Sequence, residues 1–268
     1  MRRLAWLALL CLVLGGPVAA QPSMVVRVYY WSDYIDESIL QDFTKKTGIK
    51  VVYDTFDSND TLETKLLAGN IGYDIVVPTS AFLARQIKAG VFRKLDKSKL
   101  PNWKNLDTDL MARVARFDPG NEHAFIYMWG TTGFAYNVDK IKERLPDAPL
   151  GSARMLFDPA VVSKLKDCGV YFLDAADEML ASALAYLGED PDSKDPAVLE
   201  KGAEVLRKVR PYVRKFHSSE NINALANGNI CIAAIWSGDA GIAKQRAEEA
   251  KKKIEIEYVI TEEGGQLW

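Results

Sequence analysis

Two short clusters of aromatic, hydroxyl and acidic residues are the part of the sequence best suited to chemistry. Residues 31–34 (WSDY) follow the apolar run 25–30, and residues 236–239 (WSGD) follow the apolar run 230–235. Both runs are typical of buried strands. Ligands bind outside the carboxyl ends of strands in open α/β sheets, so the two clusters are expected to face one cleft. Flat aromatic faces combined with carboxylates suit an organic cation.

Each of these residues also has a structural interpretation. Trp31 and Trp236 could be core aromatics, and Asp33 and Asp239 could cap the helices that follow them. The shared position of both pairs at strand exits favours the binding interpretation. A capping acid at the rim of a cleft can still face a ligand.

Strands and helices alternate along the rest of the chain, which predicts an α/β fold with a mostly parallel sheet. We expect a first lobe at residues 21–137 that is rejoined by 257–268, and a second lobe at 138–256. In the second lobe Glu178 follows the predicted strand 170–173, at the rim that corresponds to Trp31. Taken alone, Glu178 is more typical of a solvated helix position.

Enzyme signatures are sparse. The two histidines, His123 and His217, have no partners at the spacing of a zinc site. The chain contains no nucleophile elbow, phosphate loop or dinucleotide fingerprint. We therefore expect a binding protein without a catalytic residue, metal or cofactor, in which both histidines have structural or surface roles.

The first residues of the 268-residue chain are typical of export. Arg2 and Arg3 precede the apolar run 4–14, and small residues end at Ala20, which predicts a signal peptide cleaved at that point. A membrane anchor is the alternative, but the apolar run is too short to span comfortably. The formal net charge is −2, and the basic residues do not cluster into a stripe. Both observations argue against nucleic acid as a partner.

Two cysteines remain after the expected cleavage removes Cys11. Cys168 and Cys231 each lie beside or within a predicted strand. An even pair in an exported chain favours a disulfide, and two buried free thiols are the alternative.

In combination, several motifs resemble those of bacterial periplasmic polyamine-binding proteins that serve ABC importers, above all the putrescine-binding type. They lie at residues 30–34, 74–79, 95–101, 127–133 and 236–239. The resemblance covers nearly all of residues 24–268. It implies a type II periplasmic binding protein whose two lobes close on a diamine, and a bridge between Cys168 and Cys231.

The resemblance also implies which residues bind the ligand. One lobe would contribute Trp31, Ser32, Asp33, Tyr34 and Thr79, and the other Glu178, Trp236 and Asp239, with Trp268 as an aromatic wall. Thr79 keeps the hydroxyl of the more usual serine. Ala81 and Ala175 replace larger or acidic side chains of spermidine-preferring relatives, which favours putrescine over longer polyamines.

The resemblance further implies a periplasmic, monomeric protein whose closed form is read by an inner-membrane permease. Relatives continue beyond the position of Trp268 with another cleft acid and a site tyrosine, so the chain is expected to be C-terminally truncated. A truncated copy with impaired or no binding is therefore one alternative. A periplasmic hydrolase is another alternative. It would need a nucleophile–base pair in the cleft, and the presence of only two histidines argues against one.

Overall fold

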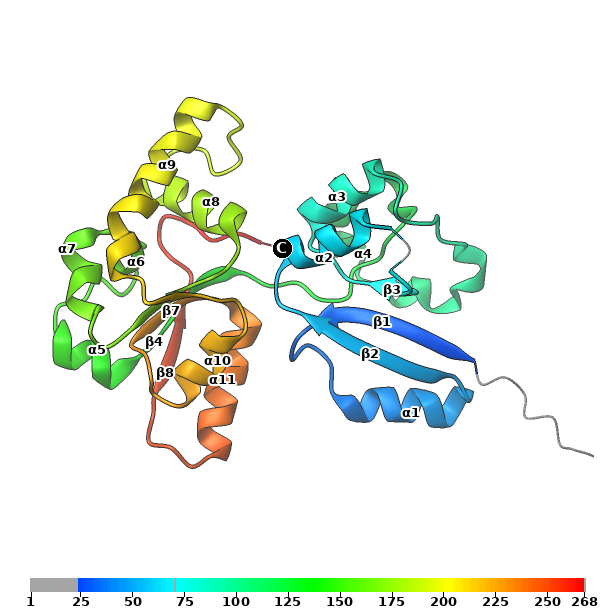
Figure 1. Ribbon diagram of the computed structural model, residues 1–268, viewed down its shortest axis with the longest axis horizontal. Coiled ribbons are helices and arrows are strands. Elements are labelled where there is room, and N and C mark those ends of the chain that lie inside the picture. The colour runs from blue at the N-terminus through cyan, green and yellow to red at the C-terminus, as the bar shows by residue number, and fades with distance from the viewer. Residues whose placement is uncertain (1–23, 70, 268) are drawn as a thin grey trace, which may run out of the picture.

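The computed structural model describes residues 24–69 and 71–267 and shows two lobes side by side (Figure 1). Each lobe is built on a β-sheet with helices packed around it, which confirms the predicted two-lobed α/β fold. The predicted signal peptide at residues 1–20 and the predicted site residue Trp268 lie outside the described residues.

The first lobe contains a three-stranded parallel sheet in the order β2-β1-β3. Its strands and helices are β1 (Val25–Trp31), α1 (Glu37–Thr47), β2 (Lys50–Phe56), α2 (Asn59–Leu67), β3 (Ile75–Val76), α3 (Ser80–Lys88) and α4 (Thr108–Val114), with 3₁₀ helices at Lys97–Lys99, Pro101–Asn105 and Pro119–Asn121. Helix α1 is capped by Asp36, whose carboxylate accepts a hydrogen bond from the Ser38 amide at 2.8 Å. Asp33 is therefore not the cap of this helix.

The second lobe contains a five-stranded mixed sheet in the order β6-β5-β7-β4-β8. Its elements are β4 (Thr132–Asn137), α5 (Val138–Arg144), α6 (Arg154–Phe157), α7 (Pro159–Val162), β5 (Val170–Phe172), α8 (Ala176–Tyr186), α9 (Pro196–Val209), β6 (Lys215–Phe216), α10 (Glu220–Ala226), β7 (Ile232–Trp236), α11 (Ser237–Glu249) and β8 (Ile256–Val259), with 3₁₀ helices at Ser163–Leu165 and Arg210–Tyr212. Strand β5 runs parallel to β6 and β7, whereas β4 runs antiparallel to β7 and β8.

Strand β7 is buried on both faces, and its side chains alternate between two hydrophobic clusters. Ala233 and Ile235 pack in the cluster that contains α10 and α11, whereas Ile232, Ala234 and Trp236 pack in the larger one. That larger cluster also includes Trp31 and other residues of the first lobe. Trp236 therefore leaves the sheet toward the other lobe.

The predicted boundary between the lobes is wrong on two points. Strand β4 pairs with β7, so residues 132–137 belong to the second sheet and the chain crosses between lobes before Thr132. Strand β8 pairs with β4, so residues 256–259 extend the second sheet instead of returning to the first lobe. Pairing partners are set by contacts that are distant in sequence, and alternation within a single strand does not reveal them.

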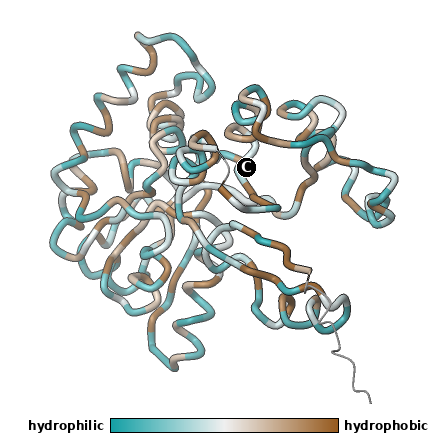
Figure 2. Tube along the Cα trace, turned by 45° about the vertical axis from the view of Figure 1, so that its right-hand side comes forward, coloured by the Kyte–Doolittle hydropathy of each residue, from teal (hydrophilic) through white to brown (hydrophobic). Residues whose placement is uncertain are grey.

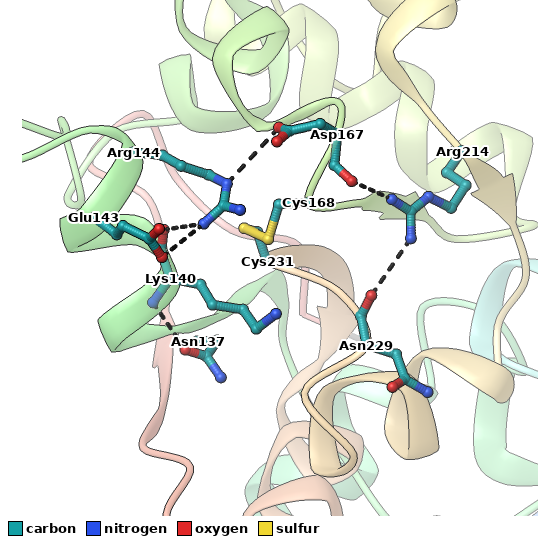
Figure 3. Close-up of a disulfide and its surroundings, with 9 residues drawn as sticks. All are labelled: Asn137, Lys140, Glu143, Arg144, Asp167, Cys168, Arg214, Asn229 and Cys231. Atoms are coloured by element: carbon teal, nitrogen blue, oxygen red, sulfur yellow. Dashed lines mark hydrogen bonds and ion pairs between the residues drawn. A yellow bond between two sulfur atoms is a disulfide. The ribbon is translucent and has the colours of Figure 1, made fainter.

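Cys168 and Cys231 form a disulfide, with their Cα atoms 5.5 Å apart (Figure 3). The bridge joins the segment before β5 to the segment before β7. Beside it, the Arg214 guanidinium donates hydrogen bonds to the backbone oxygens of Asp167 and Asn229, at 2.7 and 3.4 Å. The predicted bridge is confirmed, and it fixes the amino-terminal end of β7.

Hydrophobic and hydrophilic residues alternate along the outer helices (Figure 2). Helix α9, for example, buries Gly202, Val205 and Val209 while its charged residues face outward. Within the described part of the chain, no helix combines the length and the apolar character needed to cross a membrane.

Candidate ligand-binding site

The two predicted tryptophans meet where the lobes face each other. Trp31 ends β1 in the first lobe and Trp236 ends β7 in the second. Their ring centroids lie 5.2 Å apart at an interplanar angle of 80°, an edge-to-face contact. The Trp31 indole donates a hydrogen bond to the Val77 carbonyl at 2.8 Å, and the Trp236 indole donates one to Glu178 at 2.9 Å. Both rings are thus held in place by their own lobes.

Glu178 lies in the first turn of α8 and is buried, with 7 % of its surface exposed. One of its carboxylate oxygens accepts hydrogen bonds from the Thr132 hydroxyl at 2.5 Å and from the Trp236 indole. Burial raises the pKa of Glu178 to about 7, although these two hydrogen bonds oppose the shift. Glu178 is therefore a buried, hydrogen-bonded carboxyl group and not a solvated helix residue.

Asp239 lies in the first turn of α11 and is 1 % exposed. Burial raises its pKa to about 7, and the neighbouring carboxylates of Asp33 and Glu178 add to the shift. The Tyr34 hydroxyl is close enough to Asp239 to interact electrostatically and lower that pKa. However, Tyr34 Oη and Asp239 Oδ1 are both buried without a partner at normal hydrogen-bond geometry among the described residues. These two atoms are polar groups that a bound donor could satisfy.

Asp33 lies at the more exposed edge of this cluster. Its backbone φ is +66°, in the left-handed region that aspartate tolerates better than most residues. Its carboxylate accepts a hydrogen bond from the Arg246 guanidinium at 2.6 Å. Asp33 thus contacts the second lobe through an ion pair with Arg246.

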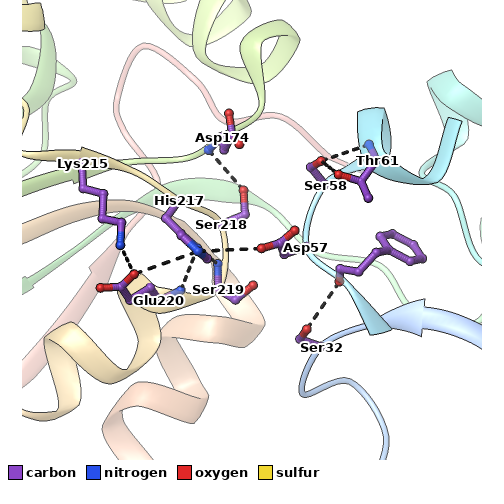
Figure 4. Close-up of polar contacts among 11 residues, drawn as sticks. Ser32, Asp57, Ser58, Thr61, Asp174, Lys215, His217, Ser218, Ser219 and Glu220 are labelled. Atoms are coloured by element: carbon purple, nitrogen blue, oxygen red, sulfur yellow. Dashed lines mark hydrogen bonds and ion pairs between the residues drawn. The ribbon is translucent and has the colours of Figure 1, made fainter. Parts of the chain in front are cut away.

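A cavity of about 1420 Å³ opens beside the tryptophans, mostly in the first lobe. Of the predicted residues, Trp31, Tyr34, Thr79 and Trp236 line it. Its volume exceeds that of a typical small-ligand pocket, so a diamine would fill only a part. Ser32 makes a different contact, because its hydroxyl donates to the Phe56 carbonyl at 3.4 Å at the end of β2 (Figure 4).

A second contact between the lobes involves His217 and Asp57, with Nε2 and the carboxylate 3.8 Å apart (Figure 4). The other ring nitrogen of His217 accepts hydrogen bonds from the Ser219 and Glu220 amides, at 3.2 and 3.1 Å. The His123 ring is hydrogen-bonded to buried Asp118 at 2.9 Å. Both histidines have structural contacts, and the described residues contain no cluster that could hold a metal ion.

Sequence reasoning missed Arg246 and Thr132, which hydrogen-bond to the predicted carboxylates of Asp33 and Glu178. Arg246 lies about two turns after Asp239 on α11, so helical periodicity places both on one face and could have revealed it. Thr132 gave no such signal, because its role depends on the pairing of β4 with β7, which sets Thr132 opposite Trp236. The cavity is also lined by four tyrosines that were not predicted: Tyr30, Tyr53, Tyr73 and Tyr127.

Comparison with known proteins identifies the family of the chain. The model of the bacterial extracellular solute-binding protein family matches residues 38–268. The chain belongs to this family. Its members bind solutes and are not enzymes, which agrees with the expectation from the sequence.

Three proteins similar to this solute-binding protein are named for putrescine or spermidine. It is 57 % identical to the putrescine-binding periplasmic protein SpuD of Pseudomonas aeruginosa over 96 % of this chain and 71 % of the relative. It is 50 % identical to the putrescine-binding periplasmic protein PotF of Escherichia coli, over 97 % and 70 %. The structure of the spermidine/putrescine ABC transporter substrate-binding protein PotD of Streptococcus pneumoniae matches with a TM-score of 0.67 and 31 % identity, covering 92 % of this chain and 71 % of that one.

Proposed function

We propose that this protein captures a polyamine, preferably putrescine, in the periplasm and delivers it to an ABC permease in the inner membrane. The observation that carries the proposal is the meeting of Trp31 and Trp236 beside two buried carboxyl groups, Glu178 and Asp239. Neither carboxyl group has an ion-pair partner within 4.0 Å among the described residues. A ligand with ammonium groups would supply the missing charge.

The charge of the cluster suits a dication. When ionised, Asp33, Glu178 and Asp239 carry three negative charges, and Arg246 offsets one of them. The remaining two negative charges equal the two ammonium charges of a diamine. A charged hydrogen bond contributes about 1.5–3 kcal/mol, and a desolvated cation–π contact contributes up to about 2 kcal/mol. A few such contacts reach the roughly 8 kcal/mol of micromolar affinity.

The proposed ligand residues are Trp31, Ser32, Asp33, Tyr34, Thr79, Glu178, Trp236, Asp239 and Trp268. Because they come from both lobes, a ligand that contacts both sets favours the closed arrangement. A small cavity of about 10 Å³ lies between Trp31, Trp236 and Ala175. The short side chain of Ala175 supports a preference for the shorter diamine, whereas Ala81 is exposed on α3.

Isothermal titration calorimetry with putrescine tests the proposal. We expect one site with micromolar affinity, and 1-aminobutane, which carries a single ammonium group, is expected to bind about 10- to 100-fold more weakly because one charged contact is lost. Asp239→Asn should weaken putrescine binding by about 10- to 100-fold. The matched control is Glu248→Gln, which removes an exposed acid from the same helix. Absence of heat with every amine, or equal affinity for putrescine and 1-aminobutane, would contradict the proposal.

We also propose that the protein is exported, cleaved after Ala20, and monomeric. The basic, apolar and small-residue segments of residues 1–20 support export. N-terminal sequencing of the protein from a periplasmic extract should begin at Gln21, and size-exclusion chromatography should give a monomer.

A further inference from the structure

Glu178 and Asp239 are two buried carboxyl groups that lack a counter-ion of their own. Glu178 faces Asp177 on its own helix, Tyr34 from the loop after β1, Tyr258 from β8 and Asp239 from α11. Asp239 in turn faces Tyr34, Asp33, Glu178 and Arg246. The one cation among these neighbours is Arg246, and its guanidinium is hydrogen-bonded to Asp33 at 2.6 Å.

A buried carboxylate without a cation is costly, and a carboxyl group in that position takes up a proton instead. Two donors, from Thr132 and Trp236, contact one oxygen of Glu178, whereas Asp239 Oδ1 has no partner at normal geometry. The pKa values of both groups are accordingly raised by burial to about 7. In the ligand-free protein near neutral pH, protons therefore provide part of the charge balance that a dication would provide.

We propose that ligand capture is coupled to proton release: the incoming ammonium groups displace the acidic protons of Glu178 and Asp239 into the solvent. The inference rests on the proposed function and adds regulation by pH to the same site. Aliphatic amines have pKa values near 10, so the ligand keeps both of its own charges at neutral pH. The O–H bond of each carboxyl group breaks, its proton passes to the buffer, and the resulting carboxylate accepts hydrogen bonds from an ammonium group.

The coupling has a definite sign. Protons compete with the ligand, so affinity is expected to rise with pH. If both groups titrate near 7 in the ligand-free form and are ionised in the complex, affinity at pH 8 exceeds that at pH 6 by about 100-fold. The number of protons released is expected to be about one per ligand at pH 7 and close to two at pH 6.

Calorimetry of the wild-type protein in two buffers measures this release. Putrescine is titrated at one pH in phosphate and in imidazole, which both buffer near pH 7 but differ in ionisation enthalpy, and the difference in observed enthalpy gives the number of protons taken up by the buffer. We expect a buffer-dependent enthalpy that is larger at pH 6 than at pH 8. Binding with the same affinity and no proton release at both pH values would overturn the inference and leave the proposed function intact. Absence of binding at every pH would instead count against the proposed function.

Glu178→Gln distinguishes the contribution of Glu178 to proton release from that of Asp239. Glutamine has nearly the same shape and keeps an acceptor for Thr132 and Trp236, but it cannot ionise. We expect the proton count to fall by about half and the pH 6 to pH 8 change in affinity to drop to about tenfold. Glu248→Gln, the matched exposed control, should keep the wild-type values. An unchanged proton count in Glu178→Gln would overturn the assignment of this group.

Infrared difference spectroscopy provides a readout that needs no variant. At pH 6 the C=O band of protonated carboxylic acids should decrease when putrescine is added to the wild-type protein. A spectrum without that loss, recorded under conditions where binding occurs, would also overturn the inference.

Discussion

The Asp33 carboxylate and the Arg246 guanidinium are 2.6 Å apart and join the two lobes. Asp33 belongs to the loop after β1, and Arg246 belongs to α11, which packs on the second sheet. The pair can form only when the lobes approach each other. Arg246 also donates to Asn223 at 3.0 Å, so the guanidinium is held by the second lobe before it meets Asp33.

Arg246→Ala should weaken closure of the two lobes. The side chains of this pair are each 34 % exposed, so solvent screening limits its contribution to about 1 kcal/mol. That energy corresponds to about fivefold in ligand affinity, expressed mainly as faster dissociation. Stopped-flow fluorescence of the cleft tryptophans measures the dissociation rate. Lys244→Ala, an exposed change on the same helix, is the control, and equal dissociation rates for the two variants would contradict this prediction.

Thr132→Val should impair binding through Glu178. The Thr132 hydroxyl donates to the Glu178 carboxylate at 2.5 Å and lowers the pKa of that group. Without this donor the ionised carboxylate is less stable, so affinity at pH 7 should fall by about tenfold. The pH dependence of binding should also shift upward. Thr132→Ser keeps the hydroxyl and should restore both values. If serine and valine behave alike in the calorimeter, the hydrogen bond has no role in binding.

The positions of the tryptophans could be predicted because they depend on local sequence. A buried strand reads as an apolar run, and the residue that ends it lies at the sheet edge, as Trp31 and Trp236 do. The lobe boundary could not be predicted in this way. Strand β4 joins β7, almost a hundred residues later in the chain, and no property of residues 132–137 alone specifies that partner.

The contacts within the site depend on tertiary packing in the same way. Asp33 was predicted as a ligand carboxylate, and the structure shows its hydrogen bond to Arg246, a residue 213 positions away. The raised pKa of Glu178 follows from its burial beneath Trp236 and Thr132. Taken alone in the sequence, Glu178 was more typical of a solvated helix position. Residue types thus indicated the chemistry, whereas the arrangement of charge required the fold.

Replacing both bridged cysteines by alanine should lower the free energy of unfolding without changing the site. The disulfide closes a loop with a sequence separation of 63, for which the chain-entropy model gives about 4 kcal/mol. The bridge precedes β7, whereas Trp236 lies at the opposite end of that strand. Urea unfolding of Cys168→Ala/Cys231→Ala should therefore show a lower free energy of unfolding than the wild type. Putrescine affinity should change less than about twofold. The wild-type protein under reducing conditions is the control, and an unchanged unfolding midpoint in both would contradict the prediction.

Glu178 should make the ligand-free protein less stable as pH rises. Burial raises the pKa of Glu178 from 4.5 to about 7 in the folded state, so the folded protein binds this proton more tightly than the unfolded chain. The stabilising effect of this proton is fully present below pH 4.5 and is lost as pH rises through 7. A shift of this size corresponds to a loss on the order of 3 kcal/mol.

Chemical denaturation at pH 5 and pH 8 tests this dependence. Glu178→Gln cannot ionise, so its unfolding free energy should fall between these pH values by about 2–3 kcal/mol less than that of the wild type. Glu248→Gln should follow the wild type, because it changes an exposed side chain away from the buried carboxyl groups. A Glu178→Gln protein that loses as much stability as the wild type would show that Glu178 is already ionised in the folded, ligand-free protein. Proton release from Glu178 during ligand capture would then be contradicted as well.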